Sequence, residues 1–251
     1  MTAWTDRKFV LVAYEDDYCR ALHNVVKALL RERGGNVSLS DPQTAQGTGN
    51  FARYVGPWLG QRLRETREQP AGVVLVADAD RPGNLVTNHP GPPREGPAAE
   101  DDAWIKGLED AWRASLIQRA SLDANRASCL RVLCVRWTKE SVLVSAISAL
   151  RAWAPSAGSL DAVLKSCPPE PDAVADVEYT ATFRRPARCM DTVTRGVAER
   201  PYKKGRDDVD IMDMIHQSPA ALDEVQRRCP DLVRLVEKIT EVASTSPRPL
   251  A

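Results

Sequence analysis

The chain has 251 residues, and its 34 Lys and Arg are balanced by 34 Asp and Glu, which excludes a global basic field that would recruit nucleic acid. Its length suffices for one large or two small domains, and its six cysteines form no C-x-x-C pair, so we expect reduced, mostly structural thiols and neither a zinc site nor a disulfide framework. Nothing at the N-terminus resembles a signal peptide and no run approaches transmembrane length, so we expect a cytoplasmic protein with no membrane partner.

The first predicted strand covers residues 8–14 and ends on Glu15, Asp16 and Asp17. Its uniformly apolar run indicates a strand buried on both faces, as is typical of parallel sheets. An apolar stripe with helical spacing follows over residues 18–30. Asp16 or Asp17 fits the N-cap of this helix. Glu15 is a poorer cap and stands at the carboxyl end of the strand, where open α/β sheets bind ligands.

A second buried strand is predicted in residues 71–81, AGVVLVADADR, and it ends on Asp78 and Asp80. These two carboxylates share one side-chain direction on a strand, so they repel each other unless something compensates them. A Mg²⁺ ion, which one or two carboxylates hold together with waters and phosphates, is one interpretation. An N-cap aspartate beside a solvated neighbour is the other. The stretch alone leaves both open.

The remaining elements of the first 153 residues alternate. A polar loop spans residues 41–50, and an amphipathic helix follows from Phe51 to Leu63, with an arginine-bearing outer face. A long Pro/Gly-rich segment over residues 81–102 precedes a helix over 104–116, a strand over 129–137 and a helix over 139–153. Strands that alternate with amphipathic helices favour βαβ crossovers. We therefore predict an α/β fold with a mainly parallel, four-stranded sheet and helices on both faces.

Beyond Ala154 the texture changes, because prolines, Pro186 among them, interrupt a stretch without long periodic patterns. A basic segment over residues 200–206 leads into a helical tail. Ser218 and Pro219 fit an N-cap and first helical position, and Pro230 implies a break between two helices. We therefore divide the chain into an α/β domain, 1–153, and a smaller, mostly helical C-terminal extension, 154–251.

A strand that ends in glutamate, a helix and a later strand that ends in Asp-x-Asp resemble the Toprim fold of topoisomerases, primases and overcoming-lysogenization-defect (OLD) nucleases. More narrowly, the chain resembles small stand-alone bacterial Toprim-like proteins found near defence genes and mobile elements. Three further blocks carry this resemblance: residues 136–146 (RWTKESVLVSA), 202–205 (YKKG) and 227–235 (RRCPDLVRL). The resemblance spans about residues 8–240 by this motif matching.

The resemblance implies a metal-dependent site. Glu15, Asp78 and Asp80 would hold Mg²⁺ or Mn²⁺, with Glu15 alternatively acting as general base or acid. Glu140 would add a carboxylate, although a first-turn acid favoured by the helix dipole is its simpler interpretation. Lys204 would reach the scissile phosphate, and the residues that would contact nucleic acid are Arg81, Lys203 and Lys204. A solvated basic run is the alternative for the two lysines.

Two classes of function follow from the resemblance. The first is a Mg²⁺-dependent nuclease that acts on DNA or RNA as an antiphage effector, with a partner protein such as an ATPase encoded nearby. The second is a catalytically inactive Toprim-like module that binds a partner protein or nucleic acid. The Asp-x-Asp strand end favours the nuclease. The zero net charge favours the binding module, as does Asp16, which stands where such families commonly place glycine.

Overall fold

The computed structural model describes residues 8–15, 19–34, 37–44, 71–78, 98–135, 140–154, 160, 162 and 186–244. At residues 8, 19, 78, 98–102 and 186–188 only the backbone is described. The predicted helix from Phe51 to Leu63, most of the loop at 41–50, and residues 81–97 of the Pro/Gly-rich segment lie outside these ranges.

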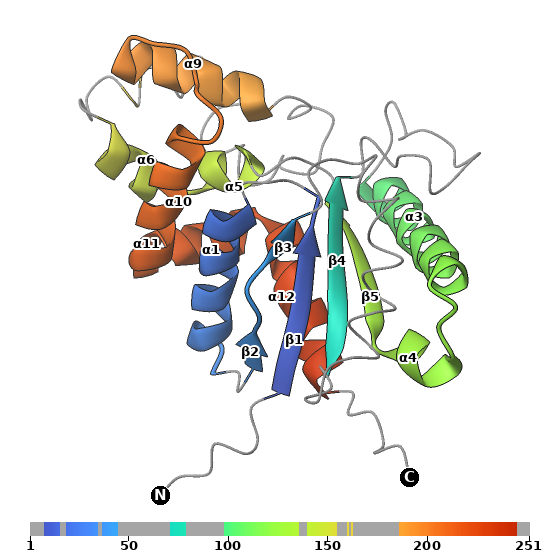
Figure 1. Ribbon diagram of the computed structural model, residues 1–251. Coiled ribbons are helices and arrows are strands. Elements are labelled where there is room, and N and C mark those ends of the chain that lie inside the picture. The colour runs from blue at the N-terminus through green and yellow to red at the C-terminus, as the bar shows by residue number, and fades with distance from the viewer. Residues whose placement is uncertain are drawn as a thin grey trace, which may run out of the picture.

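A parallel sheet forms the centre of the molecule (Figure 1). Its strands are β1 (Lys8–Tyr14), β2 (Val37–Leu39), β3 (Gln43–Thr44), β4 (Gly72–Asp78) and β5 (Leu130–Val135). Their order is β2-β1-β4-β5, β3 also pairs with β1, and every pair is parallel. The predicted α/β class and parallel sheet are confirmed. The described part of the sheet has five strands where four were predicted, since two short strands flank Pro42, which has no N–H to donate.

Side chains alternate across this sheet and bury against helices on both faces. Leu11 and Ala13 of β1 share a core with Trp112 of α3 (Ala98–Arg119). Val10 and Val12 belong to the core on the opposite face, which includes apolar residues of α1 (Cys19–Glu32) and α12 (Pro230–Ser244). In Figure 1, α3 therefore lies on one side of the sheet and α1 and α12 on the other.

The C-terminal residues complete this second layer. Helix α12 packs on β1, β4 and β5, although it belongs to the segment that the sequence assigns to an extension. A Cβ built on Gly72 of β4 would collide with the side chain of Val242 of α12 and with the Cys129 carbonyl. Because only glycine leaves room for this approach, the first residue of β4 is adapted to a helix at the far end of the chain.

The other helices that the structure describes are shorter. They are α4 (Ala124–Ser128), α5 (Glu140–Ser145), α6 (Ile147–Trp153), α9 (Pro186–Ala198), α10 (Asp207–Gln217) and α11 (Pro219–Arg228). The Ser218 N-cap is confirmed, because its hydroxyl accepts a hydrogen bond from the Ala221 N–H at 3.3 Å. The break before Pro230 is confirmed as well. Helix α9 was missed, because Pro186 begins the helix and does not interrupt structure there.

The single helix predicted over residues 139–153 is two helices, α5 and α6, separated at Ala146. Glu224 of α11 stabilises this break. Its Oε2 accepts hydrogen bonds from the backbone N–H of Ser148 at 2.8 Å and from the Ser148 hydroxyl at 2.9 Å. The carboxylate thus binds an amide of the first turn of α6, which the residue before that helix does not cap. Periodicity alone does not reveal such a cap.

A buried carboxylate binds a backbone N–H of β5, the last strand in the order of the described sheet. Glu109 of α3 accepts a hydrogen bond at 3.0 Å from the N–H of Cys134 in β5, and it pairs with Arg234 and, at 3.0 Å, with Lys238, both of α12. Arg113 of α3 donates to the Leu130 carbonyl on the same strand. Side chains therefore occupy backbone groups that an edge strand would otherwise offer to another chain.

The four cysteines that the structure describes with side chains are buried, and none of them is in a disulfide: Cys129, Cys134, Cys189 and Cys229. Burial, followed by the charge of Glu109, raises the pKa of the Cys134 thiol, so this thiol stays protonated and unreactive.

Candidate active site

The parallel register brings the first two acidic strand ends to the same edge of the sheet. Tyr14 of β1 is paired with Val76 of β4, and the next residue, Glu15, donates its backbone N–H to the Val76 carbonyl at 3.1 Å. Glu15 is buried, with 9% of its surface exposed. Asp78 is the last residue of β4 and is paired with Val135 of β5. The backbones of Glu15 and Asp78 therefore stand at adjacent strand ends.

Glu140 comes to this end of the molecule on α5, the helix that follows β5 (Figure 1). Glu140 is an acid in the first turn of its helix, a position that the helix dipole favours, but only 1% of its surface is exposed. Its Oε1 accepts a hydrogen bond from the Tyr202 hydroxyl at 3.2 Å and lies 3.9 Å from Nζ of Lys204. Its Oε2 has no hydrogen-bond partner among the described residues. Glu140 is therefore not an ordinary solvated helix-terminal acid.

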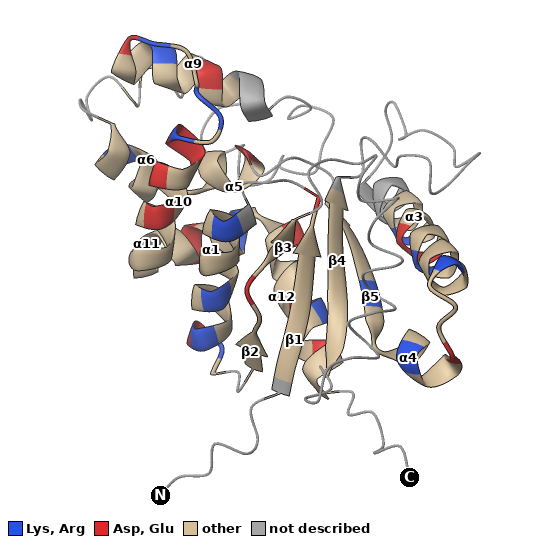
Figure 2. Ribbon diagram, in the orientation of Figure 1, with Lys and Arg blue, Asp and Glu red and all other residues tan. Residues whose placement is uncertain are grey.

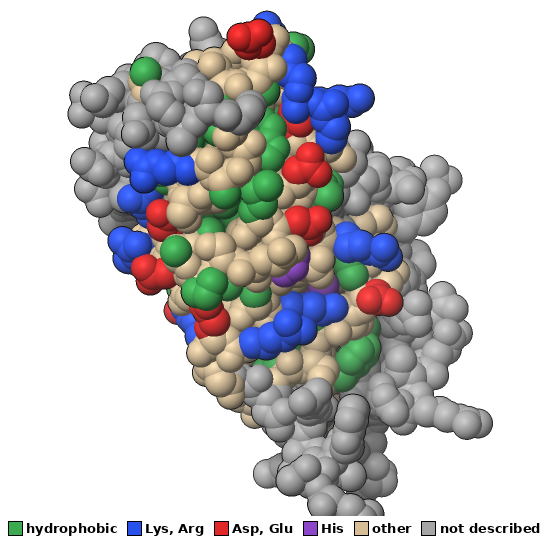
Figure 3. Space-filling view, turned by 90° about the vertical axis from the view of Figure 1, so that its left-hand side faces the viewer, with side chains coloured by type: hydrophobic (Ala, Val, Ile, Leu, Met, Phe, Trp, Pro, Cys, Tyr) green, Lys and Arg blue, Asp and Glu red, His purple; other side chains and the backbone are tan. Residues whose placement is uncertain are grey.

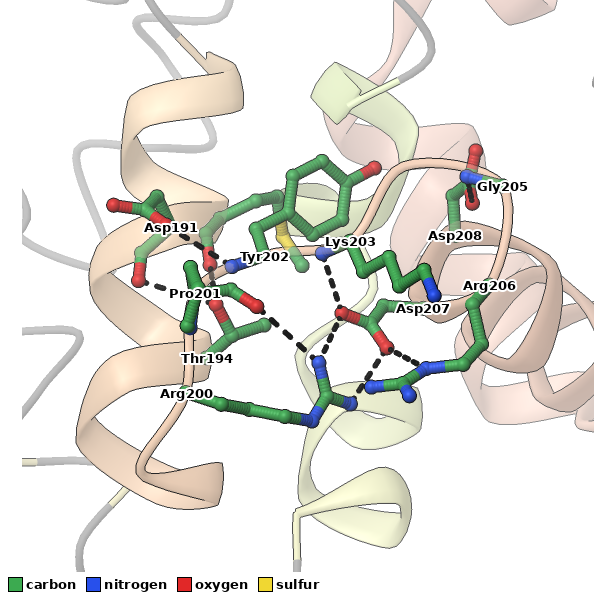
Figure 4. A network of polar contacts seen from close by, with 11 residues as sticks. Asp191, Thr194, Arg200, Pro201, Tyr202, Lys203, Gly205, Arg206, Asp207 and Asp208 are labelled. Atoms are coloured by element: carbon green, nitrogen blue, oxygen red, sulfur yellow. Dashed lines mark hydrogen bonds and ion pairs between the residues drawn. The ribbon is translucent and has the colours of Figure 1, made fainter.

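The basic segment between α9 and α10 is held by three aspartates through its backbone (Figure 4). Asp191 of α9 accepts from the N–H of Tyr202 at 3.0 Å. Asp207 and Asp208, in the first turn of α10, accept from the N–H of Lys203 at 2.8 Å and of Gly205 at 2.6 Å. Gly205 adopts φ +86°, a conformation that glycine accepts without strain. The segment is therefore a built turn with a defined path.

Asp207 is the centre of this turn (Figure 4). It is fully buried and receives both terminal nitrogens of Arg200 at 2.7 Å, as well as Nε of Arg206 at 3.1 Å. Burial alone would raise its pKa, but the hydrogen bonds from Arg200, from the Lys203 amide and from Arg206 lower the pKa of Asp207 to about 2. Asp207 thus pairs with two of the four cations of the segment, Arg200 and Arg206.

The two lysines of the turn differ in their surroundings. Both are exposed, and the segment that carries them is the basic connection between α9 and α10 in Figure 2. Lys204 lies near Glu140, whereas no described residue forms an ion pair with Lys203. Acidic and basic side chains are interspersed over most of the face in Figure 3, so the described part of this face is not a broad basic surface.

A buried histidine supports the end of β1. The Nε2–H of His23 donates to the Ser40 carbonyl at 2.8 Å, which leaves Nδ1 to accept from the Tyr14 hydroxyl at 3.0 Å. Burial, followed by the nearby charge of Lys27, lowers the pKa of His23 to about 4. The neutral ring thereby joins α1 to β1 at the residue directly before Glu15.

The structure does not describe the other predicted site residues. The Asp78 side chain, Asp80 and Arg81 lie outside the described residues, as does the arginine face that was predicted after residue 51. Within the described ranges, no group of three or more His, Cys, Asp or Glu side chains is arranged to hold a metal ion. Glu140 nevertheless fits a cation, because its buried Oε2 is an oxygen donor without a hydrogen-bond partner in the described residues.

Three residues that build this region, Asp191, Asp207 and Asp208, were not predicted from the sequence, and Tyr202 was noted only as part of the YKKG motif. The pair Asp207-Asp208 before the apolar positions of α10 does signal a helix start. That signal predicts a contact with the helix's own amides and gives no indication that both carboxylates bind the preceding turn.

Comparison with protein-family models, with curated proteins and with solved structures finds no match to this chain. None of the helices in the described ranges has both the length and the apolar character that a membrane span needs.

Proposed function

We propose that this protein is a Mg²⁺- or Mn²⁺-dependent nuclease with a Toprim-like fold. The observation that carries the proposal is the meeting of strand ends: β1 and β4 are parallel neighbours, so Glu15 and the start of the Asp78-x-Asp80 motif share one sheet edge. A third carboxylate, the buried Glu140, lies on the helix that follows β5, and β5 is the strand next to β4.

In this proposal Asp78, Asp80 and Glu140 hold the metal ion, and Glu15 completes the site or acts as general base. The bound ion would neutralise charge that develops on the phosphodiester. Glu15 as base would take a proton from the attacking water, and the water oxygen would bond to phosphorus. The bond from phosphorus to the leaving sugar oxygen would break, and that oxygen would take up a proton from solvent. Lys204 would approach the scissile phosphate, while Lys203 and Arg81 contact the nucleic-acid backbone.

The proposed biological setting is defence against phage in the cytoplasm, with a partner such as an ATPase encoded nearby. It rests on the resemblance of the acidic motifs and of the YKKG segment to stand-alone Toprim-like proteins. The contact between Tyr202 of that segment and Glu140 gives this motif a physical connection to the proposed acidic site.

A binding module without catalysis is the second candidate. It is favoured by the zero net charge and by Asp16, which stands where such families commonly place glycine.

A cleavage assay separates the two candidates. Purified protein, alone or with the product of a neighbouring gene, should cleave labelled DNA or RNA with Mg²⁺ or Mn²⁺ and stop with chelator. Asp80→Ala should lower the rate by about 10²–10³-fold, as expected when a group that stabilises transition-state charge is removed. Asp223→Ala on α11 removes an equal charge from an exposed helix surface and should leave the rate unchanged. Tight nucleic-acid binding without cleavage, with Asp80→Ala neutral, would favour the module.

A further inference from the structure

The buried carboxylate of Glu140 is incompletely compensated by the described residues. One oxygen accepts a single hydrogen bond, from Tyr202 at 3.2 Å, and the other has no hydrogen-bond partner in the described part of the chain. Burial of a carboxylate is unfavourable unless it is hydrogen-bonded and its charge is matched. Tyr202 keeps its proton as a donor, because burial and then Glu140 itself raise the pKa of Tyr202. The positive charge that an ion pair brings to Glu140 comes from Lys204.

The Lys204 contact has the properties of a replaceable one. Its Nζ lies 3.9 Å from Oε1, beyond hydrogen-bond distance, and half of the Lys204 side chain is exposed. A pair of this length, with one partner so well solvated, is weak. The backbone on either side is fixed, because the Lys203 and Gly205 amides are bound by Asp207 and Asp208. The flexible side chain of Lys204 can therefore move away from Glu140 while the backbone of this turn keeps its conformation.

We propose that the Lys204 ammonium and a divalent cation compete for Glu140, so that metal binding releases Lys204 toward a phosphate of the nucleic acid. This inference rests on the proposed function and adds to it a coupling between the two ligands. A metal ion at Glu140 repels the nearby ammonium. A phosphate that binds beside the metal gives that ammonium a new anionic partner. Lys204 therefore holds the place of the metal in the free protein and contacts the substrate in the loaded one.

Lys203 provides the matched comparison. It is the next residue in the same turn, it is exposed, and no described residue pairs with its ammonium. Replacing either lysine by methionine removes one positive charge from the same turn and keeps much of the side-chain length. Only the Lys204 change removes the competitor of the metal at Glu140.

The test is calorimetric titration of the full chain with Mn²⁺ in the absence of nucleic acid. Lys204→Met should bind Mn²⁺ about three- to tenfold more tightly than the wild type, as expected when a weak competing pair is removed. Lys203→Met should stay within about twofold, because it removes only a more distant charge. In a Glu140→Gln background, Lys204→Met should give no gain, because the shared partner is gone. Thermal unfolding of each variant verifies that it is folded.

The outcomes separate this inference from the proposed function. If Lys204→Met binds Mn²⁺ no more tightly than wild type, while Asp78→Ala/Asp80→Ala abolishes binding, the competition is overturned and the metal site stands. If Lys203→Met gains as much as Lys204→Met, the effect is general electrostatics and the competition is likewise overturned. If the wild type and Lys204→Met bind no Mn²⁺ at all, the metal-dependent function falls together with the inference.

Discussion

Tyr202 donates a hydrogen bond to Glu140 at 3.2 Å although 62 residues separate them in the chain. The contact joins the turn before α10 to the first residue of α5. Tyr202→Phe keeps the ring and removes the donor, so it leaves a buried carboxylate with one partner fewer.

We expect Tyr202→Phe to lower the free energy of unfolding by about 1–3 kcal/mol, the usual effect of leaving a buried polar group unsatisfied. The measurement is urea unfolding followed by circular dichroism. In a Glu140→Gln background the same substitution should have a smaller effect, since the charge that needs the donor is absent. Equal effects in both backgrounds would show that the hydrogen bond carries no energetic coupling.

The Glu109 contacts with Arg234 and Lys238 give a second prediction. Glu109→Ala removes the acceptor of the Cys134 amide and the shared partner of two cations on α12. We expect a loss of about 2–4 kcal/mol in the free energy of unfolding, because buried groups are left unpaired. The control is Asp110→Ala, an exposed acid next to it on α3, which should change stability by about 0.5 kcal/mol or less. Similar losses in the two variants would show that the contacts of Glu109 make no specific contribution to stability.

His23 predicts a specific dependence of stability on pH. Its pKa is about 4 in the folded protein, against 6.5 for an unperturbed histidine. The folded state thus resists protonation, so the stabilisation is complete above pH 6.5 and is lost as the pH falls toward 4. Between pH 7.5 and 5.0 we expect this residue alone to lower the free energy of unfolding by about 2 kcal/mol.

The measurement compares urea unfolding at these two pH values for the wild type, His23→Gln and His216→Gln. A glutamine at 23 has a donor and an acceptor but does not titrate, so the pH-dependent loss should shrink by about 2 kcal/mol. His216 is a partly exposed helix residue, and its variant should keep the wild-type loss. An unchanged loss in His23→Gln would assign the effect to other groups.

The elements that could be predicted from the sequence are those whose own residues determine them. The apolar runs of β1 and β4, the stripe of α1 and the Ser218 cap are local patterns, and the structure has each of them. The packing of α12 on the sheet is different, since an amphipathic stripe shows that a helix is buried on one face and not what it is buried against. The fit of Gly72 against Val242 depends on two residues far apart in the chain.

The candidate site divides in the same way. Glu15 and Asp78 could be placed at one sheet edge, because a parallel sheet aligns the carboxyl ends of its strands. The burial of Glu140 could not be predicted, because its position at a helix start is equally compatible with a solvated acid. Its surroundings come from Tyr202 and Lys204, which no local pattern connects to it.

Metal binding at the carboxyl edge of the sheet is tested most directly by calorimetric titration of the wild type and of Asp78→Ala/Asp80→Ala with Mn²⁺. The wild type should bind the ion, and the double variant should lose that binding while it keeps the circular dichroism spectrum of a folded α/β protein. Asp213→Ala/Asp223→Ala removes two partly or fully exposed acids from α10 and α11 and should bind as the wild type does. Equal Mn²⁺ affinity in Asp78→Ala/Asp80→Ala and the wild type would contradict a metal site at this edge.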